Sequence, residues 1–249
     1  MPKRQFGVST RLYDRVRLKR EHLLEIAAHG FEAVEIVAAR THVDYHNPAV
    51  VADLQQWLAE ARLELPSLHV PLGADVEQAL FVARRIPLKV LVVEAGPSRE
   101  FARVVERVAT LASPLGVTVA VNSAGWSPAG SLVHFVESGP LDPATSAVRV
   151  GICLDFGAAQ MQGDVAEIIE VVSEHLVATH VHDCAGRRDD HLIPFDGAID
   201  WPGALTELQK IGHEGALILD VAARGTTKET LARARRARER MESFLCMSL

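Results

Sequence analysis

Short apolar segments rich in Val, Ile, Leu and Ala alternate along the chain with longer segments whose apolar residues recur at helical spacing. Nearly continuous apolar runs of this kind are typical of parallel strands that helices cover on both faces. Eight runs predict strands that begin near Phe6, Ala33, Ser67, Lys89, Val117, Val150, Ala178 and Gly215. The alternation predicts an α/β protein in which each strand is followed by a helix.

Helix boundaries are marked by capping residues. Asn47 followed by Pro48 predicts one helix start, and Asp164 predicts another. The last segment, 228–245, has arginines on one side and apolar residues on the other, as expected of a surface helix. Three glycines fall where a helix should end before the next strand: Gly30, Gly116 and Gly212.

The regular spacing of the units favours a closed barrel. Successive strand starts are separated by 22 residues (Ser67 to Lys89) to 37 residues (Ala178 to Gly215), which suits one strand and one helix each. A doubly wound open sheet is the competing architecture, but no Gly-rich phosphate-binding turn follows the first strand. We predict one (β/α)8 TIM barrel spanning residues 1–249, with its site at the carboxyl ends of the strands.

Charge and composition exclude several classes of partner. The 249 residues include 26 Lys and Arg against 32 Asp and Glu, a net charge of −6, which disfavours general nucleic-acid binding. No apolar run approaches the roughly 18 residues that span a membrane. The three cysteines are too few and too widely spaced for a disulfide framework. We therefore expect a cytoplasmic protein that acts on a small molecule.

Ionisable and polar residues lie where the predicted strands three to eight end. They are His69, Glu94, Asn122, Ser123, Asp155, His180, His182, Asp183, Cys184 and Asp220, with Asp189 and His191 in the loop after strand seven. A single such residue is more often a cap or a satisfied polar group. Six successive strands that all end this way predict an active site at the barrel mouth.

The segment around strand seven resembles a family signature. Residues 178–201 (ATHVHDCAGRRDDHLIPFDGAIDW) are similar to the sugar-phosphate isomerase/epimerase superfamily, which includes the xylose isomerase-like barrels and is related to endonuclease IV. Residues 30–35, 68–71, 151–157 and 215–220 fall in the order that the family shows. The resemblance implies isomerisation or epimerisation of a small sugar or sugar acid.

The resemblance also implies a divalent metal, held by Glu, Asp, His and Glu on strands five to eight. Asp155 and His180 match this pattern, whereas Asp220 is shorter than the family Glu and Val121 replaces the first Glu. A second family histidine is replaced by Ala158. The expected metal set is therefore incomplete: Asp155, His180 and Asp220, binding Mn²⁺, Mg²⁺, Co²⁺ or Zn²⁺ weakly.

These departures leave alternative hypotheses open. One is an isomerase-like barrel whose site has been rebuilt, by divergence or by design, to work without metal. In it Glu94 is a general base whose pKa apolar surroundings raise, unless a basic side chain pairs with it. Cys184 with His180 or His182 is the other catalytic candidate, as in an esterase, although the sequence favours a plain packed cysteine.

A third hypothesis is a non-catalytic barrel that only binds a small molecule. In any of the three, we expect substrate or ligand contacts from a set of polar and aromatic residues: His69, Asn122, Ser123, Trp126, Arg187 and His191. Trp126 would stack on a flat substrate, and Arg187 would meet a phosphate or be solvated. Endonuclease activity is disfavoured, because its metal cluster needs the carboxylate and the histidine that are missing here.

Overall fold

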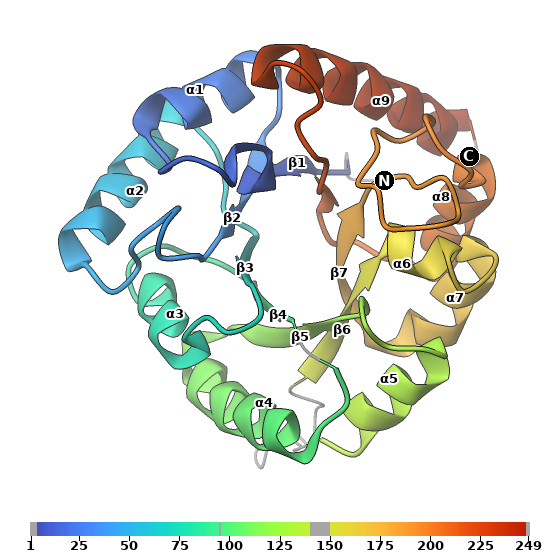
Figure 1. Cartoon of the computed structure of the whole chain (residues 1–249), viewed down its shortest axis with the longest axis horizontal. Coiled ribbons are helices and arrows are strands. Elements are labelled where there is room, and N and C mark those ends of the chain that lie inside the picture. The colour runs from blue at the N-terminus through green and yellow to red at the C-terminus, as the bar shows by residue number, and fades with distance from the viewer. Residues whose placement is uncertain (1–3, 95, 140–149, 248–249) are drawn as a thin grey trace.

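A computed structural model describes residues 4–94, 96–139 and 150–247. In it, parallel strands pair in chain order and the last pairs with the first, which closes a barrel (Figure 1). The strands are β1 (Phe6–Ser9), β2 (Ala33–Val37), β3 (Ser67–Val70), β4 (Val90–Val93), β5 (Thr118–Asn122), β6 (Val150–Asp155), β7 (Leu176–Val181) and β8 (Leu217–Leu219). The predicted TIM barrel is confirmed.

Helices surround the barrel on the outside (Figure 1). They are α1 (Arg20–Ala28), α2 (Pro48–Ala61), α3 (Val76–Ala83), α4 (Arg99–Ala112), α5 (Ala129–Glu137), α6 (Phe156–Gln160), α7 (Val165–Val172), α8 (Trp201–Lys210) and α9 (Thr227–Met247). Short 3₁₀ helices are η1 (Thr10–Tyr13), η2 (Ser113–Leu115) and η3 (Ser173–His175). No helix in the described ranges is long and apolar enough to cross a membrane.

The predicted caps are confirmed, whereas the number of helices after β6 and some strand boundaries differ from expectation. The Asn47 side chain accepts from the Ala49 backbone N–H at the start of α2, and Asp164 accepts from two backbone N–H groups of α7. Two helices, not one, follow β6, because Asp155 ends the strand and caps the short α6 immediately. Strand β7 starts at Leu176, two residues earlier than predicted, since the chain pairs with β6 from Ile152 onward.

Strand register decides which side chains face the barrel interior. Successive residues of a strand point to opposite faces. On β5, Asn122 lies inside the barrel, where its amide nitrogen is 3.0 Å from His180 Nδ1. Its neighbour Val121 therefore points outward, and it is fully buried in the layer between strands and helices. The barrel floor is a separate small apolar cluster of Val90, Val92, Ala120, Cys153 and Ala178.

Candidate functional site

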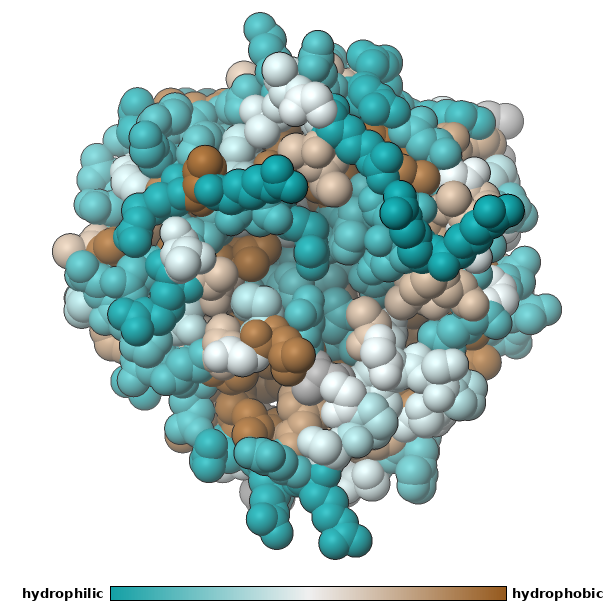
Figure 2. Space-filling view, viewed as in Figure 1, coloured by the Kyte–Doolittle hydropathy of each residue, from teal (hydrophilic) through white to brown (hydrophobic). Residues whose placement is uncertain are grey.

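The inward-facing ends of the strands bring most of the predicted polar residues together above the apolar floor. In Figure 2 the hollow at the centre of this face is lined mainly by hydrophilic residues, with a few hydrophobic ones at its border. The group consists of Glu35 on β2, His69 on β3, Glu94 after β4, Asn122 on β5, Asp155 on β6, His180 and His182 at β7, and Asp220 after β8.

Within this group Glu94 is partly open to solvent, as are the nearby side chains of Arg11, Asp189 and His191. The side chains of Glu94 and Asp189 are each 29% exposed, that of Arg11 30% and that of His191 16%. The other carboxylates and imidazoles named above are 3% exposed or less. These four side chains are therefore more accessible to solvent than the buried carboxylates and imidazoles.

Glu94 is paired with two basic side chains. Its Oε1 lies 2.8 Å from His69 Nε2 and 3.8 Å from Arg11 Nη2, and its Oε2 accepts from the Leu72 backbone N–H. Partial burial opposes ionisation, but His69 and Arg11 outweigh it and hold the pKa of Glu94 below its ordinary value. The expectation of a raised pKa is wrong, because charged partners surround the carboxylate, and the paired alternative is the correct one.

Arg11 is fixed by a buried carboxylate. Its Nε donates to both oxygens of Asp220, at 3.0 and 2.9 Å. Burial opposes ionisation of Asp220, but Arg11 and His180 overcome it and hold the Asp220 pKa well below its usual range. The guanidinium is thereby held as a fixed positive charge between Asp220 and Glu94.

Asp155 holds His182. Its Oδ1 accepts from the Ala158 backbone N–H at the start of α6 (2.8 Å) and from His182 Nε2 (3.0 Å). Burial alone would lower the pKa of His182, but Asp155 raises it to about 9. The second ring nitrogen, His182 Nδ1, is buried and has no hydrogen-bond partner in the described part of the chain.

Asp189 joins two imidazoles in the loop after β7. Its Oδ1 lies 3.5 Å from His182 Nδ1, and its Oδ2 lies 3.3 Å from His191 Nε2. The two rings are stacked, with centroids 4.1 Å apart. His191 Nδ1 donates to the Asp220 carbonyl oxygen (2.7 Å), which turns Nε2 toward Asp189.

The three residues of the metal set that the resemblance implied have other partners in the structure. Both oxygens of Asp220 already accept from Arg11, and His180 Nε2 lies 2.9 Å from Glu35. Asp155 faces His182 rather than His180. Val121 points away from the barrel interior, and Asn122 points into it. A carboxylate that binds a metal in the mouth would therefore have to stand at position 122 and not at position 121.

Two other groups of three side chains have the spacing of metal ligands in the described ranges: Glu35, His69 and His180, and His182, Asp189 and His191. The first group lacks a free nitrogen on His180. Asn122 Oδ1 accepts from the Ala124 N–H, so its amide nitrogen donates to His180 Nδ1. A neutral His180 ring then carries its proton on Nε2, the atom that faces Glu35, and cannot bind a metal there.

The second group fits a divalent metal. Since His182 Nε2 and His191 Nδ1 donate to oxygen atoms, the nitrogens that face Asp189 are the ones that would bind a metal, and His182 would release its second proton on binding. The two nitrogens lie 3.5 and 3.3 Å from the two oxygens of Asp189, and one ligand atom from each of the three residues lies within 4.8 Å of the others. Gly157 leaves the necessary room, since a Cβ there would lie 2.3 Å from His182 Cε1 and 2.8 Å from Asp189 Oδ1.

The remaining predicted residues have more ordinary environments. Cys184 is buried, burial raises its pKa, and its thiol lies 3.6 Å from the Gly157 carbonyl oxygen rather than paired with an imidazole. Trp126 is buried against Phe135, with ring centroids 4.9 Å apart, so it does not offer a stacking face at the mouth. Ser123 Oγ accepts from the Asp155 N–H, and Arg187 is exposed on the loop.

Asp183 organises the loop that carries Asp189 and His191. It accepts from three backbone N–H groups and from the indole nitrogen of Trp201: Cys184, Phe195 and Ile199 supply the backbone groups. These contacts fix residues 184–200 over the mouth. Asp183 is therefore a structural residue of the site.

Two site residues were missed from the sequence. Glu35 is a fully buried carboxylate within an apolar strand, and that position alone is a signal of function or pairing. Arg11 gave no signal, because it stands among other basic residues near the amino terminus and only the closure of the barrel places it beside Asp220.

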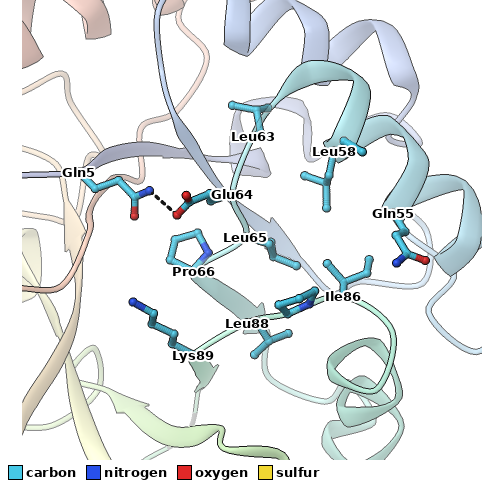
Figure 3. A pocket seen from close by; sticks show the side chains of 12 residues that line it. Gln5, Gln55, Leu58, Leu63, Glu64, Leu65, Pro66, Ile86, Leu88 and Lys89 are labelled. Atoms are coloured by element: carbon cyan, nitrogen blue, oxygen red, sulfur yellow. Dashed lines mark hydrogen bonds between the residues drawn. The ribbon is translucent and has the colours of Figure 1, made fainter.

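A pocket of about 420 Å³ lies at the opposite end of the barrel (Figure 3). It is formed by α2 and by the segments that precede β3 and β4, and its apolar lining includes Leu58, Leu65 and Leu88. The amino-terminal face of a TIM barrel usually serves stability, so this pocket is separate from the candidate site.

The strand order, the closed barrel and the ionisable groups at its mouth define a TIM-barrel protein with its candidate site at the carboxyl ends of the strands. The chain belongs to the xylose isomerase-like TIM barrel family, whose model matches residues 23–245. Among curated proteins, the uncharacterized protein MJ1311 of Methanocaldococcus jannaschii is 23% identical over 254 aligned residues, covering 87% of this chain and 83% of that protein. The uncharacterized protein y4fM of Sinorhizobium fredii is 43% identical over 53 residues, only 17% of its length.

Solved structures show the same fold. A D-tagatose 3-epimerase-like protein superposes with a TM-score of 0.77 at 21% identity, over 98% of both chains. A D-allulose 3-epimerase from Methylomonas sp. in complex with D-allulose gives 0.75 at 14% identity, over 96% of this chain and 98% of that one. At such identities the likeness establishes the fold.

Proposed function

We propose that this chain is an isomerase or epimerase of a small sugar, and that Glu94 is its general base. The observation that carries the proposal is the solvent-accessible, ionised Glu94 beside the fixed guanidinium of Arg11 at the barrel mouth. The sugar epimerases among the structural neighbours support the substrate class.

In this mechanism Glu94 removes the proton from the carbon next to the substrate carbonyl. The electron pair of the broken C–H bond is delocalised onto the carbonyl oxygen, which gives an enediolate. Return of the proton from Glu94 to the neighbouring carbon completes an isomerisation, whereas an epimerisation requires another donor to protonate the opposite face of the same carbon. Arg11, held by Asp220, lies where it can stabilise the negative charge that develops on oxygen.

His182, Asp189 and His191 are the residues that would hold the divalent metal implied by the family. Bound there, the ion would polarise a carbonyl oxygen as a Lewis acid. Asp155 and the Asp220 carbonyl oxygen orient the two imidazoles by accepting their other N–H groups, an arrangement common around metal ligands.

The test is deuterium incorporation. A panel of ketoses and aldoses is incubated in D₂O with the protein, with and without added Mn²⁺ or Zn²⁺, and followed by NMR. We expect exchange at the carbon next to the carbonyl, and Glu94→Gln should reduce the rate about 10²–10⁴-fold. Glu106→Gln, which alters an exposed carboxylate on α4, is the matched control.

Each outcome bears on the proposal. Full exchange by Glu94→Gln would exclude Glu94 as the base. Exchange that persists unchanged after chelation would favour the metal-free form of the same reaction. If the protein binds sugars and catalyses no exchange, the non-catalytic binding barrel is the correct reading.

A further inference from the structure

A buried imidazole and a buried carboxylate lie directly behind Glu94, and the mechanism above does not use them. The His69 ring is 1% exposed and stands between two carboxylates. Its Nε2 lies 2.8 Å from Glu94 Oε1, and its Nδ1 lies 3.9 Å from Glu35 Oε1. Glu35, His69 and Glu94 therefore form a row of side chains that runs from the barrel interior to the mouth.

Glu35 lies at the buried end of this row and is held by two partners. Its Oε2 accepts a short hydrogen bond from Ser67 Oγ (2.6 Å), and its Oε1 lies 2.9 Å from His180 Nε2. Burial opposes ionisation of Glu35, but His180 and His69 hold its pKa below the ordinary value. A buried carboxylate is costly unless it is paired and hydrogen-bonded, and Ser67 and His180 supply these partners to Glu35.

Glu94, in contrast, is at a strand end and has a competing partner. Arg11 Nη2 lies 3.8 Å from the same oxygen that faces His69, and a carboxylate drawn further toward Arg11 would join the Arg11–Asp220 pair. His69 opposes this movement because its own position is set inside the barrel. Glu94 Oε2, whose one hydrogen-bond donor among the described residues is the Leu72 N–H at 3.3 Å, is then left to receive a proton.

We propose that His69 is a positioning residue that holds Glu94 in the orientation needed for proton abstraction, and that Glu35 in turn holds the His69 ring. This inference rests on the proposed function, since Glu94 is the base only if that reaction occurs. In the proton transfer, the substrate C–H bond breaks, its electrons remain on the substrate, and the proton bonds to Glu94 Oε2. His69 keeps Oε1 occupied throughout.

The neighbours of Glu94 also determine the pH range in which its carboxylate is ionised. The charged and ionisable groups that face Glu94 are His69 from β3 and Arg11 from η1, and both stabilise the carboxylate. Removing His69 leaves Arg11 and the Leu72 backbone N–H as the stabilising groups, so the carboxylate should take up a proton at higher pH. The acidic limb of the pH–rate profile should move in the same direction.

The experiment compares His69→Leu with His69→Gln, whose side-chain amide retains a donor, and with Glu35→Gln. The matched control is His42→Gln, a buried histidine outside the mouth. Titration of Glu94 is followed by ¹³C NMR of labelled Glu, with the resonance assigned by its absence in Glu94→Gln. Deuterium exchange into the sugar gives kcat and KM.

We expect His69→Leu to raise the Glu94 pKa by about one unit and to lower kcat at least tenfold with little change in KM. His69→Gln should recover much of the loss, Glu35→Gln should give an intermediate effect, and His42→Gln should leave kcat unchanged. An unshifted Glu94 titration in folded His69→Leu, or in Glu35→Gln and His69→Gln if the leucine variant does not fold, would overturn the inference. Absence of exchange in the wild type would instead reject the proposed function, while the titration would still report on the contact.

Discussion

At the scale of single residues, Val121 and Asn122 show that a shift of one position along a strand decides whether a side chain can take part in the site. They are neighbours on β5, but Val121 is buried against the helices and Asn122 touches His180 inside the barrel. The carboxylate that the family places on this strand would be useful only at the inward position. Gly157 is a second such residue, because its missing Cβ makes room for His182 and Asp189.

Val121→Glu should therefore destabilise the protein rather than improve a metal site. A carboxylate would be forced into an apolar layer with no partner, and we expect the free energy of unfolding to fall by more than about 3 kcal/mol. Urea denaturation measures this, with Val121→Ala as the control for lost volume at about 1–3 kcal/mol. Tighter Mn²⁺ binding by a Val121→Glu protein of wild-type stability would contradict the assignment.

Gly157→Ala should block metal binding at His182, Asp189 and His191. The added methyl group would lie 2.3 Å from the His182 ring and displace it from Asp189. We expect calorimetry to show Zn²⁺ affinity reduced at least tenfold, as for other residues that support metal ligands. Gly130→Ala is the matched control, since a Cβ there has no atom within 4 Å; equal affinity in both variants would argue against this site.

At the scale of elements, the connections between helices and strands carry ionisable groups with structural consequences. His213, in the turn between α8 and β8, is 6% exposed. Burial, assisted by the nearby Arg4, lowers its pKa from 6.5 to about 4. The folded protein therefore keeps this imidazole neutral at a pH where the unfolded chain would protonate it.

This difference predicts a loss of stability in mild acid. The unfolded chain binds the His213 proton below about pH 6.5 and the folded protein does so only below about pH 4, so stability falls as the pH drops through this window. The full effect is about 3 kcal/mol. Urea unfolding between pH 7 and 4.5 should show this slope in the wild type and a flatter one in His213→Gln; equal slopes would contradict it.

At the scale of the whole molecule, closure of the barrel concentrates buried carboxylates at one end. Burial opposes ionisation of Asp155, Asp220 and Glu35, but neighbouring histidines and Arg11 hold all three pKa values below their ordinary values. These pairings join β2, β6, β7, β8 and η1, so their loss affects the barrel as a unit.

A second stage of acid destabilisation should follow below about pH 4. There the unfolded chain binds protons on these carboxylates while the folded protein still excludes them, so stability is lost as the pH falls toward the lowered values. Asp220→Asn should reduce stability at pH 7, because Arg11 loses its partner, and should flatten the curve below pH 4. Thermal denaturation from pH 5 to 2.5 is the measurement, and a wild-type curve that stays level below pH 4 would contradict the prediction.

Local pattern was sufficient for the fold. Apolar runs, the caps at Asn47 and Asp164, and the helix-ending Gly30, Gly116 and Gly212, each with positive φ, are encoded within a few residues of where they act. The polar strand ends from β3 to β8 likewise located the mouth. The sequence by itself thus determined the barrel, its chemical end and most of the residues gathered there.

Pairing within the mouth was decided only by tertiary structure. Arg11 and Asp220 are 209 residues apart, and nothing local to either predicts their contact. The same holds for Glu94 with His69 and for His182 with Asp155, because side-chain partners depend on strand register and on which atoms a closed barrel brings within about 4 Å. Electrostatic interactions act over these distances in space, so whether Glu94 has a raised or lowered pKa could follow only from the assembled structure.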